Sequence, residues 1–249
     1  MARLKSLIKL EGTLDNLTFY KSADGHFVRT KGGVSKKRIM NDPAFARTRE
    51  NGKEFGSIAG SGKMLRQALG SLVFRAKDAK LSSRLVKVMG QIKNRDSVNA
   101  RGERTVAEGL SNTDAMLMLK GFDFNAKAPL ASVLKVPVSV DESTGAVSLA
   151  AFNPMEQLYA PQGATHFSLQ TGFLNLDFAT GIYDLQLSDA LSFPLVQGSV
   201  APLLTPSAVP SGDGVMLHVL LIEFFQEVNG VSYLLNNGAY NVLNIVAIH

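Results

Sequence analysis

The stretch Val215–Phe225, VMLHVLLIEFF, decides the fold class because it is apolar at nearly every position. A continuous apolar run of this length is typical of a strand that is covered on both faces. Two further β-type runs follow it, Val231–Leu235 and Tyr240–Ile248, and the turn residues Asn229-Gly230 and Asn236-Asn237-Gly238 separate the three segments. The C-terminal part of the chain therefore predicts an antiparallel sheet with Val215–Phe225 as a central strand.

The β pattern extends upstream to residue 113. Short apolar or alternating runs are separated by turn signals such as Asp141–Gly145, and a long Pro-bearing loop spans Val200–Gly214. Many short strands with tight turns indicate an antiparallel β-sandwich, with an immunoglobulin-like arrangement as one option. The expected strands are Met116–Phe122, Val133–Val140, Ala146–Phe152, Thr165–Gln170, Phe173–Phe178 and Ile182–Leu187.

Residues 4–30 are expected to form two or three further strands. Ser22-Ala23-Asp24-Gly25 supplies a hairpin turn between the β-rich run around Phe19 and the run at Phe27-Val28. Because a hairpin alone is only marginally stable in water, it must pack on another surface. Packing on the rest of the chain and donation to the sheet edge of a neighbouring subunit both remain open.

Helices are predicted between these two β regions. A basic loop, residues 31–41, precedes a helix that begins near Asn41-Asp42-Pro43 and runs through Leu72, and Lys77–Asn94 and Ser97–Leu110 follow. The fold class is thus α+β, with a hairpin-plus-helices segment at residues 1–112 and a β-sandwich domain at residues 113–249.

Gly52, Gly56 and Gly60 recur every four residues and would lie along one ridge of the predicted helix. Each glycine costs about 0.5–1 kcal/mol relative to alanine, so three on one ridge indicate that another backbone approaches closely there. The alternative is that Gly56–Gly62 is a loop between two helices.

The net charge of +5 is divided unevenly along the chain. Residues 1–110 hold 23 lysines and arginines against 10 acids, and residues 111–249 hold 3 against 11. Three explanations of the basic half are open. It would bind nucleic acid, or it would bind the acidic half of another copy, or its charged side chains would only keep an exposed helical face in contact with water. Residues 30–110 contain only three aromatic residues, and Phe45 and Phe55 fit core positions, which argues against nucleic acid because stacking platforms are then few.

No motif indicates catalysis. The near-motif Gly56–Met64 lacks the spacing and the Ser or Thr of a phosphate-binding loop. The four histidines are scattered, the chain has no cysteine, and no Gly-x-Ser-x-Gly elbow occurs. We therefore expect no enzyme, no cofactor, no metal and no small-molecule substrate.

Neither a secretory signal nor an apolar run of membrane-spanning length is evident, so synthesis in the cytoplasm without a membrane span is expected. The final location stays open, with a particle and an extracellular assembly as the options.

The first part of the chain resembles a loosely related set of uncharacterised Bacteroidota proteins. The resemblance is carried by GTLDNLTFYKSADGHFVR at Gly12–Arg29 and NDPAFARTRENGKEF at Asn41–Phe55, and it covers about the first 70 residues. Those proteins open with a hairpin, continue with a basic linker and a helix, and end in a β-sandwich. Since they have no established activity, the resemblance implies a scaffold and assigns no functional residue.

These observations predict a self-assembling structural subunit of a filament, tubule or phage-like particle. The alternatives are a nucleic-acid-binding accessory protein and an adaptor for a different protein. Unlike surfaces that meet head to tail generate rings or open polymers, and the charge division provides such surfaces. The predicted contact residues are Lys36, Lys37, Arg38, Arg47 and Arg49, with Gly52, Gly56 and Gly60 as a packing ridge.

Overall fold

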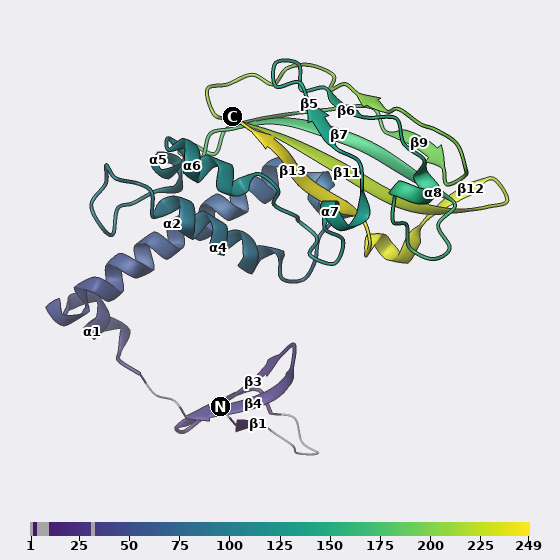
Figure 1. Ribbon diagram of the computed structural model, residues 1–249. Helices are drawn as coiled ribbons and strands as arrows, with labels where there is room; N and C mark the ends of the chain where they lie inside the picture. Colours follow the sequence, from purple (N-terminus) through teal and green to yellow (C-terminus); the bar gives the residue numbers. More distant parts are fainter. Residues whose placement is uncertain (1, 4–9, 31–32) are drawn as a thin grey trace. The chain divides into compact units, whose positions relative to one another are not determined.

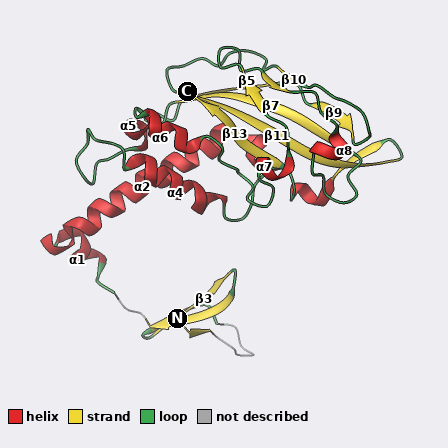
Figure 2. Cartoon of the chain, in the orientation of Figure 1, coloured by secondary structure: helices red, strands yellow, loops and turns green. Residues whose placement is uncertain are grey.

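The computed structural model describes residues 2–3, 10–30 and 33–249, and the chain forms two compact units, Met1–Glu50 and Asn51–His249. Helices and antiparallel sheets occur together, which confirms the α+β class (Figure 2). Part of the expected strand region 4–30 and part of the expected loop 31–41 lie outside the described residues.

The unit Met1–Glu50 contains a four-stranded antiparallel sheet in the order β1-β4-β3-β2. Its turns are short: Leu14 pairs with Leu17 and Ser22 pairs with Gly25, so each connection has two residues. Asp15 has a φ of 47°, a conformation that aspartate tolerates in tight turns. The strands are β1 (Ala2–Arg3), β2 (Gly12–Leu14), β3 (Leu17–Ser22) and β4 (Gly25–Thr30).

The second half of the expected basic loop is helical, so that prediction is wrong there. Helix α1 (Lys36–Asn41) begins because the Ser35 side chain accepts a hydrogen bond from the Arg38 N–H. Asp42 then caps the 3-10 helix η1 (Pro43–Phe45) through the Ala44 N–H, at 2.9 Å.

Helix α2 (Ala46–Ala68) runs without a break through Gly52, Gly56 and Gly60, so the loop alternative for Gly56–Gly62 is wrong. It ends before Gly70, whose φ of +40° is a left-handed conformation that favours glycine. The other helices of this layer are α3 (Gly70–Arg75), α4 (Leu81–Lys93), α5 (Val106–Leu110) and α6 (Thr113–Met116), followed by the 3-10 helix η2 (Leu117–Leu119).

Two expectations for this layer are wrong. The first part of Ser97–Leu110 is a loop, because Asp96 accepts hydrogen bonds from the N–H groups of Val98, Asn99 and Thr105 and so binds the backbone in a non-helical path. Met116–Phe122 is not a strand, because the Asn112 side chain caps α6 through the Ala115 N–H.

The main sheet is built around two long antiparallel strands, β7 (His166–Leu176) and β11 (Val215–Val228). Asn229 and Gly230, with φ of 54° and 76°, form the predicted two-residue turn from β11 to β12, since a type I′ turn requires positive φ at both positions. The flanking strands are β12 (Val231–Leu234) and β13 (Val242–Ile248) beside β11, and β8 (Tyr183–Leu187) and β9 (Leu191–Pro194) beside β7.

Strand β11 is buried on both faces, as its continuous apolar pattern predicts. Leu217, Val219 and Leu221 pack in one core with residues of α2 to α6, whereas Leu220 and Phe224 pack in a second core. The second core lies against a small sheet in the order β10-β6-β5. Its strands are β5 (Val138–Val140), β6 (Val147–Leu149) and β10 (Leu203–Leu204).

The unit Asn51–His249 is therefore layered: helices, main sheet and small sheet (Figure 1). The boundary expected between residues 112 and 113, from the hairpin-plus-helices segment to the β-sandwich domain, lies inside this unit. Residues on both sides of it, such as Leu110 and Ala115, belong to the same core. Two short helices, α7 (Leu130–Val133) and α8 (Pro154–Gln157), and the 3-10 helix η3 (Leu235–Gly238) complete it.

Candidate interaction surfaces

The N-terminal sheet has an apolar face that the described residues of its unit do not bury. Residues opposite each other in a sheet share a face, so the pairs Leu14–Leu17 and Phe19–Val28 lie together on one side. Leu14 is 65% exposed and Leu17 is 40% exposed, and none of residues 10–30 and 33–50 is buried. This sheet thus has no hydrophobic core within the described part of its unit.

The opposite face of the same sheet is covered by its own side chains. Tyr20 and Phe27 stack with ring centroids 5.9 Å apart, and the Arg29 guanidinium lies 5.6 Å from the Tyr20 ring centroid. An aromatic pair and a cation–π contact of this kind stabilise a cross-strand pair without further burial. The two faces therefore differ in their need for a partner.

The predicted contact residues divide into exposed cations and residues that hold their own unit together. Lys36 and Lys37 are exposed on α1. Arg38 forms an ion pair with Asp42, with Nε 3.1 Å from the carboxylate, and lies 5.7 Å from the Phe45 ring centroid.

Arg47 and Arg49 also differ in their exposure and in the groups that they contact. Arg47 is 69% exposed and pairs with Glu50 at 2.8 Å, one helical turn away. Arg49 donates to the carbonyl oxygens of Ile39 and Asp42, at 2.8 and 2.9 Å, and so ties α1 to the start of α2. Arg49 is thus placed to hold local structure, and Arg47 is placed at the surface.

The glycine ridge is open within the chain. A Cβ placed on Gly52, Gly56 or Gly60 would meet no described atom within 4 Å outside the local helix, whereas a Cβ on Gly62 would lie 3.5 Å from the Leu85 side chain. On α2, Gly62 therefore faces the side chain of a neighbouring helix, α4, whereas the three ridge glycines do not. That the backbone of another copy packs on the glycine ridge stays a prediction.

An exposed edge strand lies at the other end of the chain. Strand β12 pairs only with β11 among the described strands, and all four of its residues are exposed, with Val231 at 51% and Tyr233 at 57%. An edge with apolar side chains and unpaired backbone groups is a template for another strand.

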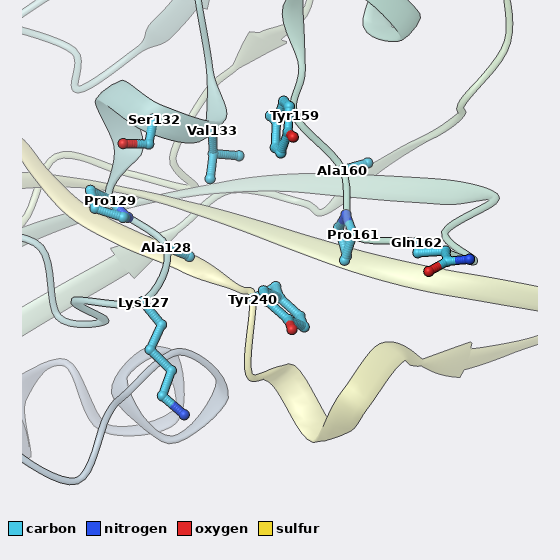
Figure 3. A pocket seen from close by; sticks show the side chains of 10 residues that line it. All are labelled: Lys127, Ala128, Pro129, Ser132, Val133, Tyr159, Ala160, Pro161, Gln162 and Tyr240. Carbon is cyan, nitrogen blue, oxygen red and sulfur yellow. The ribbon is translucent and has the colours of Figure 1, made fainter.

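An aromatic groove of about 770 Å³ lies in the unit Asn51–His249. Figure 3 shows that Tyr159, from the chain after α8, and Tyr240, from the chain before β13, both face it, and that Lys127 extends away from the two rings. Its other lining residues are Ala128, Pro129, Ser132, Val133, Ala160, Pro161 and Gln162.

Hydrogen bonds hold the backbone at Tyr159 and on both sides of Tyr240. The Tyr159 N–H donates to the Val133 oxygen at 2.7 Å, which joins the chain after α8 to α7. The buried Asn125 side chain donates to the oxygens of Ala239 and Asn241, at 3.0 and 2.8 Å, on either side of Tyr240. No periodic pattern in the sequence predicts this groove, because its two tyrosines come from segments about 80 residues apart.

The lining of the groove is mostly uncharged. Its lining residues, all of which the structure describes, include no carboxylate and no histidine. Tyrosine and proline surfaces with few polar groups fit an extended peptide segment.

The buried charges of this unit are structural. Glu54 is held by Lys93, Arg104 and the Gly102 N–H, and Glu223 is held by Arg75. Burial raises the pKa of Glu223, against the opposing effect of the Arg75 guanidinium. Among the described residues, no cluster of histidine and acidic side chains could hold a metal ion.

Helices able to cross a membrane, long and apolar enough, do not occur in the part of the chain that the structure describes.

Comparison of the chain with family models, with curated proteins and with solved structures finds no match.

Proposed function

We propose that the protein is a non-enzymatic structural subunit that assembles with copies of itself through its unit Met1–Glu50. The observation that carries the proposal is the apolar face with exposed Leu14 and Leu17 and half-buried Phe19 and Val28, on a sheet that has no core among the described residues of its unit. Small sheets need an apolar surface to pack against before they are stable in water. A second copy supplies such a surface in a fixed orientation.

The charge division supports a second copy as the partner. The unit Met1–Glu50 holds 11 lysines and arginines against 5 acids, while residues 111–249 hold 3 against 11. Complementary potentials favour the approach of unlike surfaces and disfavour like ones. Contacts between the basic unit of one copy and the acidic part of the next leave free surfaces at both ends, which produces a ring or a polymer.

The edge strand β12 is the acceptor that we propose on the neighbouring copy. Strand β2 is an outer strand of the N-terminal sheet and β12 is an outer strand of the main sheet. Their pairing would satisfy backbone groups on both edges and would join the N-terminal sheet of one copy to the main sheet of the next.

The first test compares two faces of one strand. Phe19→Asp places a charge on the open apolar face, and Thr18→Asp places the same charge on the face that carries Tyr20. We expect Phe19→Asp to convert assemblies to monomers in sedimentation velocity and electron microscopy, and Thr18→Asp to leave them intact. Wild-type protein that is monomeric at every concentration tested would overturn the proposal.

The second test addresses the acceptor edge. In a two-residue hairpin the pair next to the turn, Val228–Val231, is the hydrogen-bonded pair, so the Ser232 N–H points away from β11. Ser232→Pro removes that outward donor and is expected to lower assembly, whereas Ser232→Thr is expected to keep it. Equal assembly by both variants would reject β12 as the acceptor while leaving the role of the N-terminal unit to the first test.

A further inference from the structure

A second groove, independent of the surfaces described above, lies on the helical layer of the unit Asn51–His249. It has a volume of about 640 Å³ and is lined by residues of α2, of α3 and of the turn that leads into α4. The side chains that carry the argument are Lys63, Arg66, Phe74 and Lys77.

Phe74 is an exposed aromatic residue in this groove. Leu72 and Val73 before it are buried in the core at 0% and 6% exposure, and Arg75 after it is paired with Glu223. Phe74 itself is 76% exposed. The Lys77 Nζ lies 5.0 Å from its ring centroid, so a cation is already held beside the aromatic surface.

The positive charge of the groove is not balanced by ion pairs among the described residues. Lys63, Arg66 and Lys77 form no ion pair with any residue that the structure describes. Asp78 is the carboxylate in the lining, and it is engaged by the Arg84 guanidinium and by the N–H groups of Lys80 and Ala126. Three cations are therefore available to an anionic ligand.

We propose that this groove binds single-stranded nucleic acid, with a base stacked on Phe74 and phosphates held by Lys63, Arg66 and Lys77. Sequence-tolerant binding of single strands combines a positive groove with an exposed aromatic ring in this way. An acidic peptide would use the cations but would have no use for the ring. This site is separate from the proposed assembly surfaces and does not depend on them.

The structure also removes the argument against nucleic acid that the composition suggested. Phe55, expected in the core, is 61% exposed on α2, and Phe74 is more exposed still. The basic half therefore offers aromatic surface beside its cations, which the residue count alone did not show.

The experiment measures the fluorescence anisotropy of labelled oligothymidylate with the full chain over a range of salt concentrations. Contacts with three phosphates predict a slope of log affinity against log salt of about −2, from a slope of about −0.7 for each phosphate on a single strand. Phe74→Ala is expected to weaken binding about 10-fold, since stacking contributes about 1–3 kcal/mol per base. The control Phe55→Ala removes an exposed aromatic residue outside the groove and is expected to bind as the wild type does.

A second pair of variants tests the phosphate contacts. The double variant Lys63→Glu and Arg66→Glu should bind weakly and with a shallower salt slope, whereas Lys87→Glu, on exposed surface of α4 outside the groove, should retain most of the affinity. Absence of binding at low salt would overturn the proposal. Wild-type affinity of Phe74→Ala would overturn it as well, and competition by polyglutamate as strong as that by oligothymidylate would point instead to an acidic protein partner.

Discussion

Removing the negative charge of Glu54 should destabilise the unit Asn51–His249 more than any comparable surface change. The Glu54 side chain is 5% exposed, and its carboxylate accepts from Lys93 at 2.6 Å, from Arg104 at 2.8 and 2.9 Å, and from the Gly102 N–H at 2.8 Å. Glu54→Gln keeps the shape of the side chain but leaves Lys93, whose side chain is 6% exposed, without its counter-ion.

The size of the effect follows from two independent lines. Arg104, followed by Lys93 and the Gly102 N–H, lowers the pKa of Glu54 from 4.5 to about 2 against the effect of burial. At 1.36 kcal/mol per unit this difference corresponds to about 3 kcal/mol, and solvent at Arg104, which is 24% exposed, reduces it to about 2–3 kcal/mol. Breaking a buried ion pair by removing one partner costs about 3–5 kcal/mol in other proteins. We therefore expect a loss of about 3 kcal/mol.

The measurement is urea unfolding of the full chain at pH 7, followed by circular dichroism. The matched control is Glu103→Gln, because Glu103 pairs with Lys53 in the same region but both side chains are 61% exposed, and its loss should be below about 1 kcal/mol. Since the pKa of Glu54 in the folded state lies below its value in the unfolded state, the contribution of Glu54 to stability is complete above about pH 4.5 and is lost as the pH falls toward 2. The difference in unfolding free energy between wild type and Glu54→Gln should therefore shrink over that range. Equal unfolding free energies for Glu54→Gln and Glu103→Gln at pH 7 would refute this reasoning.

Three further predictions concern other parts of the chain. Burial, aided by His249, lowers the pKa of the fully buried His218 to about 4, so the folded state loses stability as the pH falls from 6.5 toward 4. In urea unfolding at these two pH values, His218→Leu should reduce that loss by about 2 kcal/mol. An unchanged pH dependence would argue against this role of His218. Gly56→Ala should raise the unfolding free energy by about 0.5–1 kcal/mol, since no described atom outside the local helix lies within 4 Å of the added Cβ. Gly109→Ala should lower the unfolding free energy, because the added Cβ would lie 2.3 Å from the Ile92 oxygen. The opposite order of the two variants would contradict the packing described. Combined reversal of Lys36, Lys37 and Arg47 to Glu should abolish assembly with unchanged circular dichroism, while particles of wild-type size in light scattering would exclude these side chains as contacts.

Several features of this protein could be predicted from local sequence alone. The apolar run Val215–Phe225 identified a central strand, because only a segment covered on both faces is apolar without alternation. Asn229-Gly230 identified its hairpin, because glycine and asparagine accept the positive φ that a two-residue turn requires. The uneven charge distribution is a property of composition and needs no fold to be seen.

Other features were decided only by contacts between distant segments. Whether a cation is free or engaged depends on partners that periodicity does not reveal: Arg104 meets Glu54 from 50 residues away. Phe55 and Phe74 are large apolar residues of the kind expected in a core. The orientation of their helices nevertheless exposes both side chains at the surface.

The aromatic groove shows the same limit, because the backbone at its tyrosines is held by a hydrogen bond to α7 and by Asn125, more than 100 residues before Tyr240. Short-range preferences are properties of a few neighbouring residues and are therefore readable in the sequence. Burial, pairing and the shape of a groove are properties of surfaces that only folding brings together.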